Sequence, residues 1–301
     1  MSAALDAPGV ALGTQELIAL RQIALNAASS PPLTALPGGF ATRRKGHGLE
    51  VADTREYQPG DDIRHVDRGT TARTGVLHVR QFQEERDQVT LLVADFRPEM
   101  FWGLRRAFRS VAAAEALALI GWNVVERGGR VALLTISAAG PVIVPPRGRA
   151  RGMLDVIGGL VQAHGTALEM AVAGQGESPA LDGALSRAER LVPSGSEIVV
   201  ASGFDTQGED LGDRLSALAL RRSPRLVLIT DAEAGQMPRG RYPIRLPDGR
   251  RIRVYLGANV EKDTAPMRVI AGREALILDA GESVEQMAQR LAASFQMARA
   301  A

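Results

Sequence analysis

Four runs of apolar residues recur along the middle of the chain, and each has a polar residue at or next to its end. They cover about 89–94, 130–136, 197–202 and 225–230. A continuous apolar run of this length is typical of a strand that is covered on both faces. Segments with helical spacing lie between them, at about 103–127, 150–164, 181–191 and 210–220. This alternation predicts an α/β fold with a mostly parallel sheet and helices on both faces.

The N-terminal part of the chain does not share this alternation of apolar runs and helical segments. Residues 1–13 are mostly small and apolar, and we expect them to be disordered. A helix is predicted over 14–28, capped by Thr14 and stopped by the serines and prolines that follow it. Residues 37–86 are rich in glycine and charge, with one predicted strand over 76–82. A segment this long either contains more regular structure than its pattern shows or has a shape that serves a function of its own.

The C-terminal part is predicted to contain a hairpin and a helix. Strands at 242–246 and 250–255 flank a turn at Asp248-Gly249, and a helix is expected over 284–297. Pro145 and Pro146 are expected to interrupt regular structure in the middle of the chain. The predicted units are 1–36 (disordered start and helix), 37–86 (charged segment), 87–231 (α/β core) and 232–301 (hairpin and helix packed on the core).

Composition excludes several classes of protein. The 301 residues contain no cysteine, which excludes disulfides, thiolate metal sites and a cysteine nucleophile. Neither a signal peptide nor a run of about 18 apolar residues is found, so we expect a cytoplasmic protein without membrane contact. The net charge is only +2, and aromatic residues are scarce beside the arginines. Nucleic acid is therefore not an expected partner.

Acidic residues follow three of the predicted strands. Asp95 and Asp231 come directly after a strand, and Asp205 follows another by three residues. In a parallel sheet these ends meet at one edge, which is where such sheets bind ligands. Three carboxylates there could hold Mg²⁺ or Mn²⁺. Alternatively, each aspartate accepts hydrogen bonds from a helix N-terminus or from loop amides.

The most polar stretch of the chain runs from Arg55 to Asp67. Its Asp61, His65 and Asp67 could form a metal site, or His65 and an aspartate could act as a general base. No nucleophile-elbow, zinc-protease or phosphate-loop motif accompanies them. The turn at 59–62 instead favours aspartates that bond their own backbone, with nearby arginines as ion-pair partners. We interpret the stretch first as a structural network, with a partner-binding surface and catalysis as the alternatives.

Three motifs between residues 46 and 86 resemble those of the bacterial family called Domain of Unknown Function 58. The family patterns are G-x-G-x-E, R-E-Y-x-P-G-D-D-x-R-x-I-D-W and A-R-T-G-x-L-x-V-R-x-F-x-x-E, and residues 231–238 resemble a fourth, D-x-E-x-x-x-L-P. The matching residues are Gly46, Gly48, Glu50, Arg55, Glu56, Tyr57, Pro59, Gly60, Asp61, Asp62, Arg64, Asp67, Ala72, Arg73, Thr74, Gly75, Leu77, Val79, Arg80, Phe82, Glu85, Asp231, Glu233, Met237 and Pro238. Arg68 departs from the pattern, because the family has tryptophan there. The likeness extends over about 38–295.

The resemblance implies a von Willebrand factor A-like, Rossmann-like core. Such domains commonly hold a divalent cation through D-x-S-x-S, a loop threonine and a strand-end aspartate. Here the first motif reads Asp95-Phe96-Arg97-Pro98-Glu99, with Arg97 and Glu99 in place of the serines, and Gly203 stands at the aspartate position. An arginine there would pair with Asp95 and repel a cation. We therefore expect no metal and no cofactor; if an ion does bind, Asp95 and Asp205 are its expected ligands.

The resemblance also implies a non-enzymatic role. Family members are typically encoded beside MoxR-type AAA+ ATPases and are thought to act with them in assembling or maturing protein complexes. We therefore expect an adaptor that binds such an ATPase and other von Willebrand A-domain proteins. The expected contact residues lie at the carboxyl edge of the sheet: Asp95, Arg97, Glu99, Ser202, Asp205 and Asp231. The expected structural network comprises Arg55, Glu56, Tyr57, Asp61, Asp62, Arg64, Asp67, Arg73 and Arg80. The alternative is a metal-dependent hydrolase that uses Asp61, His65 and Asp67.

Overall fold

The structure is a computed structural model of the chain. It describes residues 5, 7–29, 50–58, 61–83, 88–232, 240–245, 251–256 and 265–300. The centre of the molecule is a seven-stranded sheet with the strand order β10-β11-β7-β6-β3-β4-β5. Its strands are β3 (Val89–Asp95), β4 (Arg130–Ile136), β5 (Ile143–Gly148), β6 (Glu197–Ser202), β7 (Ser223–Thr230), β10 (Met267–Ile270) and β11 (Arg273–Asp279). The five central strands are parallel, and the two edge strands, β5 and β10, are antiparallel to their neighbours. The predicted α/β class with a mostly parallel sheet is confirmed.

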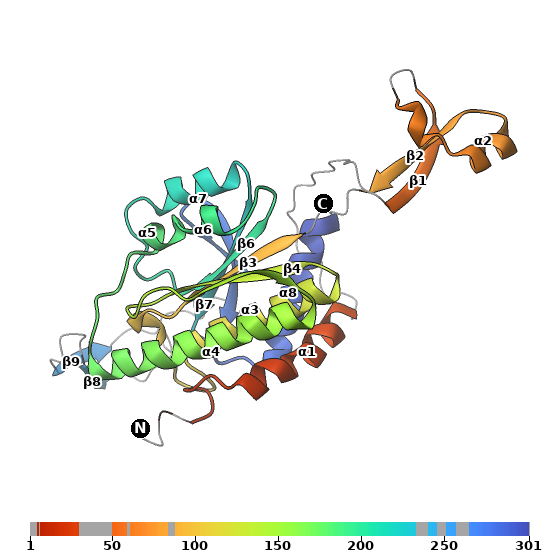
Figure 1. The fold of residues 1–301 in the computed structure, drawn as a ribbon. Coiled ribbons are helices and arrows are strands. Elements are labelled where there is room, and N and C mark those ends of the chain that lie inside the picture. Colours follow the sequence, from red (N-terminus) through yellow and green to blue (C-terminus); the bar gives the residue numbers. More distant parts are fainter. Residues whose placement is uncertain are drawn as a thin grey trace.

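Helices cover both faces of this sheet (Figure 1). One face carries α1 (Thr14–Ser29), α3 (Arg109–Glu126), α4 (Arg149–Ala173) and α8 (Val284–Ala300). The other face carries the shorter helices α5 (Leu181–Leu185), α6 (Ala188–Leu191) and α7 (Leu211–Ala219). Alternate residues of each strand point to opposite faces, so Leu92 of β3 enters the first hydrophobic core and Leu91 enters the second. This is why the central strands read as continuous apolar runs.

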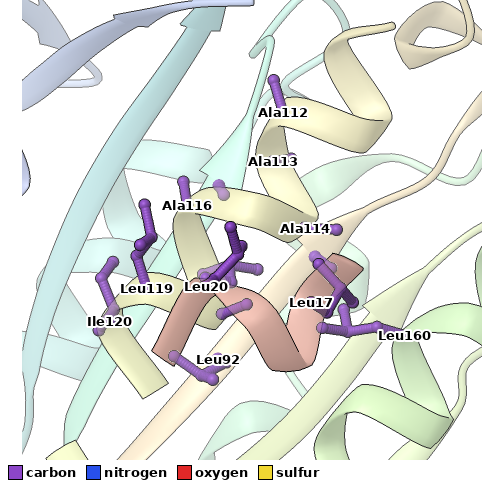
Figure 2. Close-up of a cluster of buried hydrophobic side chains, with 14 of the residues drawn as sticks. Leu17, Leu20, Leu92, Ala112, Ala113, Ala114, Ala116, Leu119, Ile120 and Leu160 are labelled. Atoms are coloured by element: carbon purple, nitrogen blue, oxygen red, sulfur yellow. The ribbon is translucent and has the colours of Figure 1, made fainter. Parts of the chain in front are cut away.

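The first core is built around α3, which lies between the sheet and α1. Most α3 residues are buried, and the run Ala112–Ala114 lets the neighbouring elements approach closely. Figure 2 shows part of this core, where side chains from α1, α3, α4 and β3 gather together. The indole nitrogen of Trp122 donates a hydrogen bond to the carbonyl of Leu17 (3.0 Å), which joins α3 to α1.

Two features at the edges of the sheet differ from the prediction. Pro145 and Pro146 do not interrupt regular structure but lie within β5. An edge strand accommodates proline, because one side of its backbone has no neighbour that needs an N–H donor. The sheet also extends beyond residue 231, where sequence analysis ended the core, since β11 pairs with β7 and β10 pairs with β11.

The segment before α1 is ordered where the structure describes it, which corrects the predicted disorder for residues 7–13. Leu12 is buried, and the carbonyl of Gly9 accepts a hydrogen bond from the backbone N–H of Phe108 (2.8 Å). Toward the other end of the chain, β8 (Gly240–Arg245) and β9 (Arg251–Leu256) form the predicted hairpin as a separate two-stranded sheet. The predicted turn at Asp248-Gly249 lies outside the described residues.

A small unit projects from the core between α1 and β3 (Figure 1). It consists of β1 (Glu50–Glu56), a 3₁₀ turn η2 (Ile63–His65), α2 (Arg68–Thr74) and β2 (His78–Gln83), with β1 antiparallel to β2. We call the described residues of this unit, 50–58 and 61–83, the arm. Sequence analysis predicted only its second strand. The arm contains much of the charged segment on which the family resemblance depends.

One of the described helices, α4, is long and apolar enough to span a membrane when judged by length and composition alone. In the fold, 44% of its most apolar stretch is buried against the rest of the chain. A core helix of a globular protein passes the same test, so this helix carries no conclusion about a membrane.

Candidate functional site

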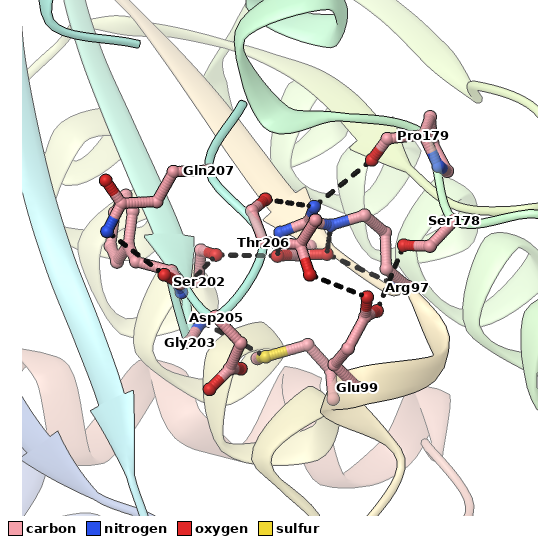
Figure 3. Close-up of polar contacts among 12 residues, drawn as sticks. Arg97, Glu99, Ser178, Pro179, Ser202, Gly203, Asp205, Thr206 and Gln207 are labelled. Carbon is pink, nitrogen blue, oxygen red and sulfur yellow. Dashed lines mark hydrogen bonds and ion pairs between the residues drawn. The ribbon is translucent and has the colours of Figure 1, made fainter. Parts of the chain in front are cut away.

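The loops at the carboxyl edge of the sheet meet in one place (Figure 3). They are the loop after β3 with its 3₁₀ turn η3 (Pro98–Met100), the segment 174–180 before α5, and the loop 203–210 after β6. We call these three segments, with residues 101–108 that lead into α3, the rim. Because β3 and β6 are adjacent and parallel, their following loops leave the sheet side by side.

Asp95 and Arg97 form a buried ion pair at the centre of the rim. The Arg97 Nε donates to Oδ1 of Asp95 (2.9 Å) and Nη2 donates to Oδ2 (2.8 Å), so the contact is bidentate. The backbone N–H of Arg97 also donates to Oδ1 (3.1 Å), and the Ser202 hydroxyl donates to Oδ2 (2.6 Å). Each of the two residues is only 1% exposed. Both carboxylate oxygens are therefore engaged by the chain's own donors, in the pairing that the sequence predicts.

The remaining nitrogen of Arg97 ties two loops together. Its Nη1 donates to the carbonyl of Pro179 (3.1 Å) and to that of Thr206 (2.6 Å). Burial alone would lower the pKa of Arg97, but its hydrogen bonds and charge interaction with Asp95, aided by the nearby charges of Glu99 and Asp205, raise the pKa above its ordinary value. The guanidinium thus stays charged, and a single cation holds three segments of the rim in place.

Glu99 reinforces the same junction from the outside. One carboxylate oxygen accepts a hydrogen bond from the Ser178 hydroxyl (3.0 Å), and the other accepts one from the Thr206 hydroxyl (3.1 Å). Figure 3 shows these contacts around Arg97. Glu99 is half-buried, so it is both a structural contact and part of the rim surface.

A second arginine reaches the rim from α3. The Arg109 guanidinium forms an ion pair with Asp205, donates to the carbonyl of Glu99 (3.1 Å) and stacks over the Trp102 ring at 5.1 Å. Arg109 is 6% exposed, whereas the Asp205 side chain is 45% exposed. A Cβ atom at Gly203 would overlap the Arg109 guanidinium. This arginine therefore occupies the space that an aspartate side chain at position 203 would need.

Asp95, Asp205 and Asp231, which the sequence offered as one possible set of metal ligands, are not grouped in this way. The carboxylate of Asp231 is buried and accepts a hydrogen bond from the backbone N–H of Leu104 (2.7 Å). Across the part of the chain that the structure describes, no three His, Asp or Glu side chains are grouped so that they could share a metal ion. Asp95 and Asp231 accept hydrogen bonds from loop amides, which is the alternative that the sequence left open, whereas Asp205 pairs with the Arg109 side chain.

Burial also corrects the list of expected contact residues. Asp95, Arg97, Ser202 and Asp231 are covered by the rim loops and present no surface to a partner. Glu99 and Asp205 do reach the surface, together with Leu104, which is 44% exposed. Three further residues of the rim, Arg109, Ser178 and Thr206, were not predicted from the sequence, because they come from distant parts of the chain and match no motif.

The arm contains the predicted network in part. Arg55 binds Asp61 through two hydrogen bonds of 2.7 Å, and the backbone N–H of Gln58 donates to the same carboxylate (2.8 Å). The hydrogen bonds from Arg55, and then that from Gln58, lower the pKa of Asp61 below its ordinary value. Asp62 caps η2 through the N–H of Arg64, and Asp67 caps α2 through the N–H of Thr70.

These contacts give Asp61 and Asp67 structural roles. Neither joins His65 in a group of three ligands among the residues the structure describes. Within the same network, the backbone N–H of Tyr57 donates to the carbonyl of Leu77 (2.8 Å), and Glu56 pairs with His78 across the hairpin. Arg64 and Arg73 are exposed, and Arg80 lies in β2 opposite Thr54. Other motif residues lie outside the described part of the chain: Gly46, Gly48, Pro59, Gly60, Glu85, Glu233, Met237 and Pro238.

The architecture defines the chain as an α/β protein whose parallel sheet is covered on both faces and carries an arm before its first core strand. A family model described as "Protein of unknown function DUF58" matches residues 53–252. The chain belongs to this family, as its motifs predict.

Comparison with curated proteins gives similarity to uncharacterized proteins of Mycobacterium bovis and Mycobacterium tuberculosis. Each is 36% identical over 102 residues, which cover 34% of this chain and 32% of the relative. The matched stretch therefore spans about a third of the length of these relatives. No solved structure matches the chain.

Proposed function

We propose that the protein is a non-enzymatic adaptor that binds protein partners through the rim. The observation that carries this proposal is the way the rim is built. Four of the five guanidinium N–H groups of Arg97 donate hydrogen bonds to Asp95 and to the rim loops, and the ordered loops leave Leu104 and Asp205 exposed. A fixed set of loops at the carboxyl edge of a parallel sheet is a suitable surface for recognition.

We further propose that the core is von Willebrand A-like and that its cation site is degenerate. Both oxygens of Asp95 accept hydrogen bonds from Arg97 and Ser202, so an ion at this place would have to displace a buried guanidinium. Recognition would then not pass through a metal ion shared with a partner's carboxylate. The residues present do not fit a metal centre, and no step of the proposed function needs one.

The proposed partner is a MoxR-type AAA+ ATPase that acts with this protein in assembling or maturing other protein complexes, and the proposed location is the cytoplasm. Family membership supports the choice of partner. No observation among the described residues favours the alternative hydrolase.

Affinity capture from the native lysate, with bound proteins identified by mass spectrometry, tests the proposal. Leu104→Asp places a charge on the rim without changing the backbone N–H that binds Asp231. The matched control is Leu220→Asp, because Leu220 is 84% exposed and follows α7, away from the rim. We expect the wild-type protein and the control to recover the ATPase, with or without EDTA in nucleotide-free buffer, and Leu104→Asp to lose it. Recovery of no ATPase, or equal recovery by all three proteins, would refute the proposal; loss with EDTA alone would refute the metal-independent mechanism.

A further inference from the structure

The outer end of the arm exposes apolar and cationic side chains together. Ile63 is 73% exposed, Leu77 is 50% exposed and Val76 is 48% exposed. Such large apolar side chains are usually covered, and a group of them on one small unit marks an interaction surface. Arginines outnumber acidic residues among the exposed charges of the arm, which are Arg64, Arg68 and Arg73 against Glu56 and Asp62. The guanidinium groups of these arginines make no ion pair or hydrogen bond with the described residues.

Among the arm residues whose side chains the structure describes, almost none form a hydrophobic core. Neither η2 nor α2 contains a buried residue, and Val79 is the one buried apolar side chain among the arm residues whose side chains are described. A two-stranded hairpin without a hydrophobic face against another element is marginally stable in water. The arm would therefore gain stability by docking its apolar end on another surface.

The exposed residues of the rim are complementary in charge to those of the arm. The rim's exposed charges in the described loops are acidic, apart from Arg105, and the same rim exposes Leu104. The acidic residues are Glu177, Asp205, Glu209 and Asp210. An acidic surface that also exposes an apolar side chain complements a basic surface with apolar side chains, and such complementarity selects partners and speeds their encounter.

The position of the arm in the fold favours docking between two molecules. The arm ends at Gln83, just before the first residue of β3, and therefore joins the core at the amino edge of the sheet. The rim lies at the opposite, carboxyl edge, about 23 Å away along the seven residues of β3. In Figure 1 the arm extends away from the sheet, with α2 near its outer end.

We propose that the arm of one molecule docks on the rim of a second copy. The two surfaces are different, so the contact is head-to-tail: two copies can exchange arms reciprocally in a twofold dimer, or the contact can repeat to give larger rings or chains. This inference goes beyond the proposed adaptor function, because it requires no other protein. A docked arm would cover Leu104 and its surroundings and would compete with any other partner of the rim.

Sedimentation velocity of the purified full chain tests the proposal. Over a concentration series at low ionic strength we expect association, and we expect it to weaken at 1 M salt, where the screening length falls to about 3 Å. The arm variant is Arg64→Glu/Arg68→Glu/Arg73→Glu, and the rim variant is Glu177→Lys/Glu209→Lys/Asp210→Lys. Each should raise the dissociation constant by about tenfold or more, because like charges then face each other. A mixture of the two variants should associate again, since each now carries a surface complementary to the other.

A matched control carries the same change in net charge elsewhere. Arg187→Glu/Arg190→Glu/Arg221→Glu alters three exposed arginines of the α6 and α7 regions and should associate as the wild type does. Circular dichroism establishes that each variant is folded. A wild-type chain that stays monomeric at every concentration would overturn the proposal, as would association that neither variant weakens or a mixture that fails to reassociate. Since these measurements use one purified protein, their failure would leave the ATPase proposal untouched.

Discussion

Asp95 and Arg97 are charges that the fold has removed from water, and their mutual hydrogen bonds compensate for the lost hydration. Removing one partner of such a pair leaves the other charge buried and uncompensated. We therefore expect Arg97→Ala to lower the free energy of unfolding by about 3–5 kcal/mol in urea titrations. The double variant Asp95→Asn/Arg97→Met removes both charges and should recover part of this loss. A cost of under about 1 kcal/mol for Arg97→Ala would contradict the structural role given to the pair.

His164 gives the protein a specific pH dependence. It is 1% exposed, its Nε2 lies 3.0 Å from the Ser110 hydroxyl, and the Phe96 and Phe101 rings pack around it. Burial lowers its pKa from the ordinary 6.5 to about 4. Between these values the unfolded chain binds a proton that the folded chain does not, so stability falls as the pH decreases below 6.5. Through this one residue, the free energy of unfolding should fall by about 2 kcal/mol between pH 6.5 and pH 5.

Comparison with His164→Gln isolates that contribution, because other groups titrate equally in both proteins. The free energy of unfolding of the wild type, minus that of the variant, should decrease as the pH falls through this range. A difference that stays constant from pH 7 to 5 would mean that the imidazole is hydrated in the folded protein.

Helix α4 contains two adjacent glycines, Gly158 and Gly159, with different surroundings. Substituting each by alanine distinguishes the effect of helix propensity on stability from the effect of packing. A Cβ atom at Gly158 would meet no atom within 4 Å, whereas at Gly159 it would lie 2.8 Å from Leu133 Cδ2 and 2.9 Å from Val144 Cγ2. Gly158→Ala should therefore raise the free energy of unfolding by about 0.5–1 kcal/mol, because alanine favours the helix. Gly159→Ala should lower it by about 1–3 kcal/mol through overpacking against β4 and β5. Thermal or urea unfolding of both variants measures this, and the same sign for both would contradict the packing of α4 on the sheet.

Helices and strands could be predicted where their burial requires a recognisable pattern of apolar residues in the sequence. The central strands β3, β4 and β6 are buried on both faces, and their continuous apolar runs gave bounds within a residue of those observed. Strand β5 contains two prolines, and its apolar and polar residues alternate only weakly. Strand β10 exposes Val269 at 67%. Neither strand therefore has the continuous apolar run of a buried strand. Strand β11 has a short apolar run, 275–278, whose signal resembles that of the central strands and could have been used.

The site was predictable only where its residues are close in sequence. Asp95 and Arg97 are two residues apart, so a motif could suggest their pairing. Arg109 and Asp205 are 96 residues apart, and Glu99 and Ser178 are 79 apart. These pairs form because the parallel topology brings separate loops to one edge, and no local pattern encodes that. Burial of the predicted contact residues likewise follows from loops that fold over them.

At the scale of the whole molecule, the core and the arm differ in how they are stabilised. The core has two continuous hydrophobic clusters, one on each face of the sheet. The described part of the arm depends on caps, turns and the Arg55–Asp61 ion pair, which involve groups near water. Such contacts fix a shape but contribute little to global stability. The proposed head-to-tail contact would supply the apolar burial that the arm lacks.

The arm lies in the sequence between two elements of the core, α1, which ends at Ser29, and β3, which begins at Val89. Both flanking elements belong to the core in their own right: α1 packs on α3, and β3 lies inside the seven-stranded sheet, between β6 and β4. Substitutions at the exposed side chains of the arm can therefore change its surface without altering a contact inside the core. Because the arm carries motifs of the family, from Arg55 to Phe82, it is a shared part of the family, and its exposed side chains are where members could differ in what they bind while the sheet and its helices stay the same.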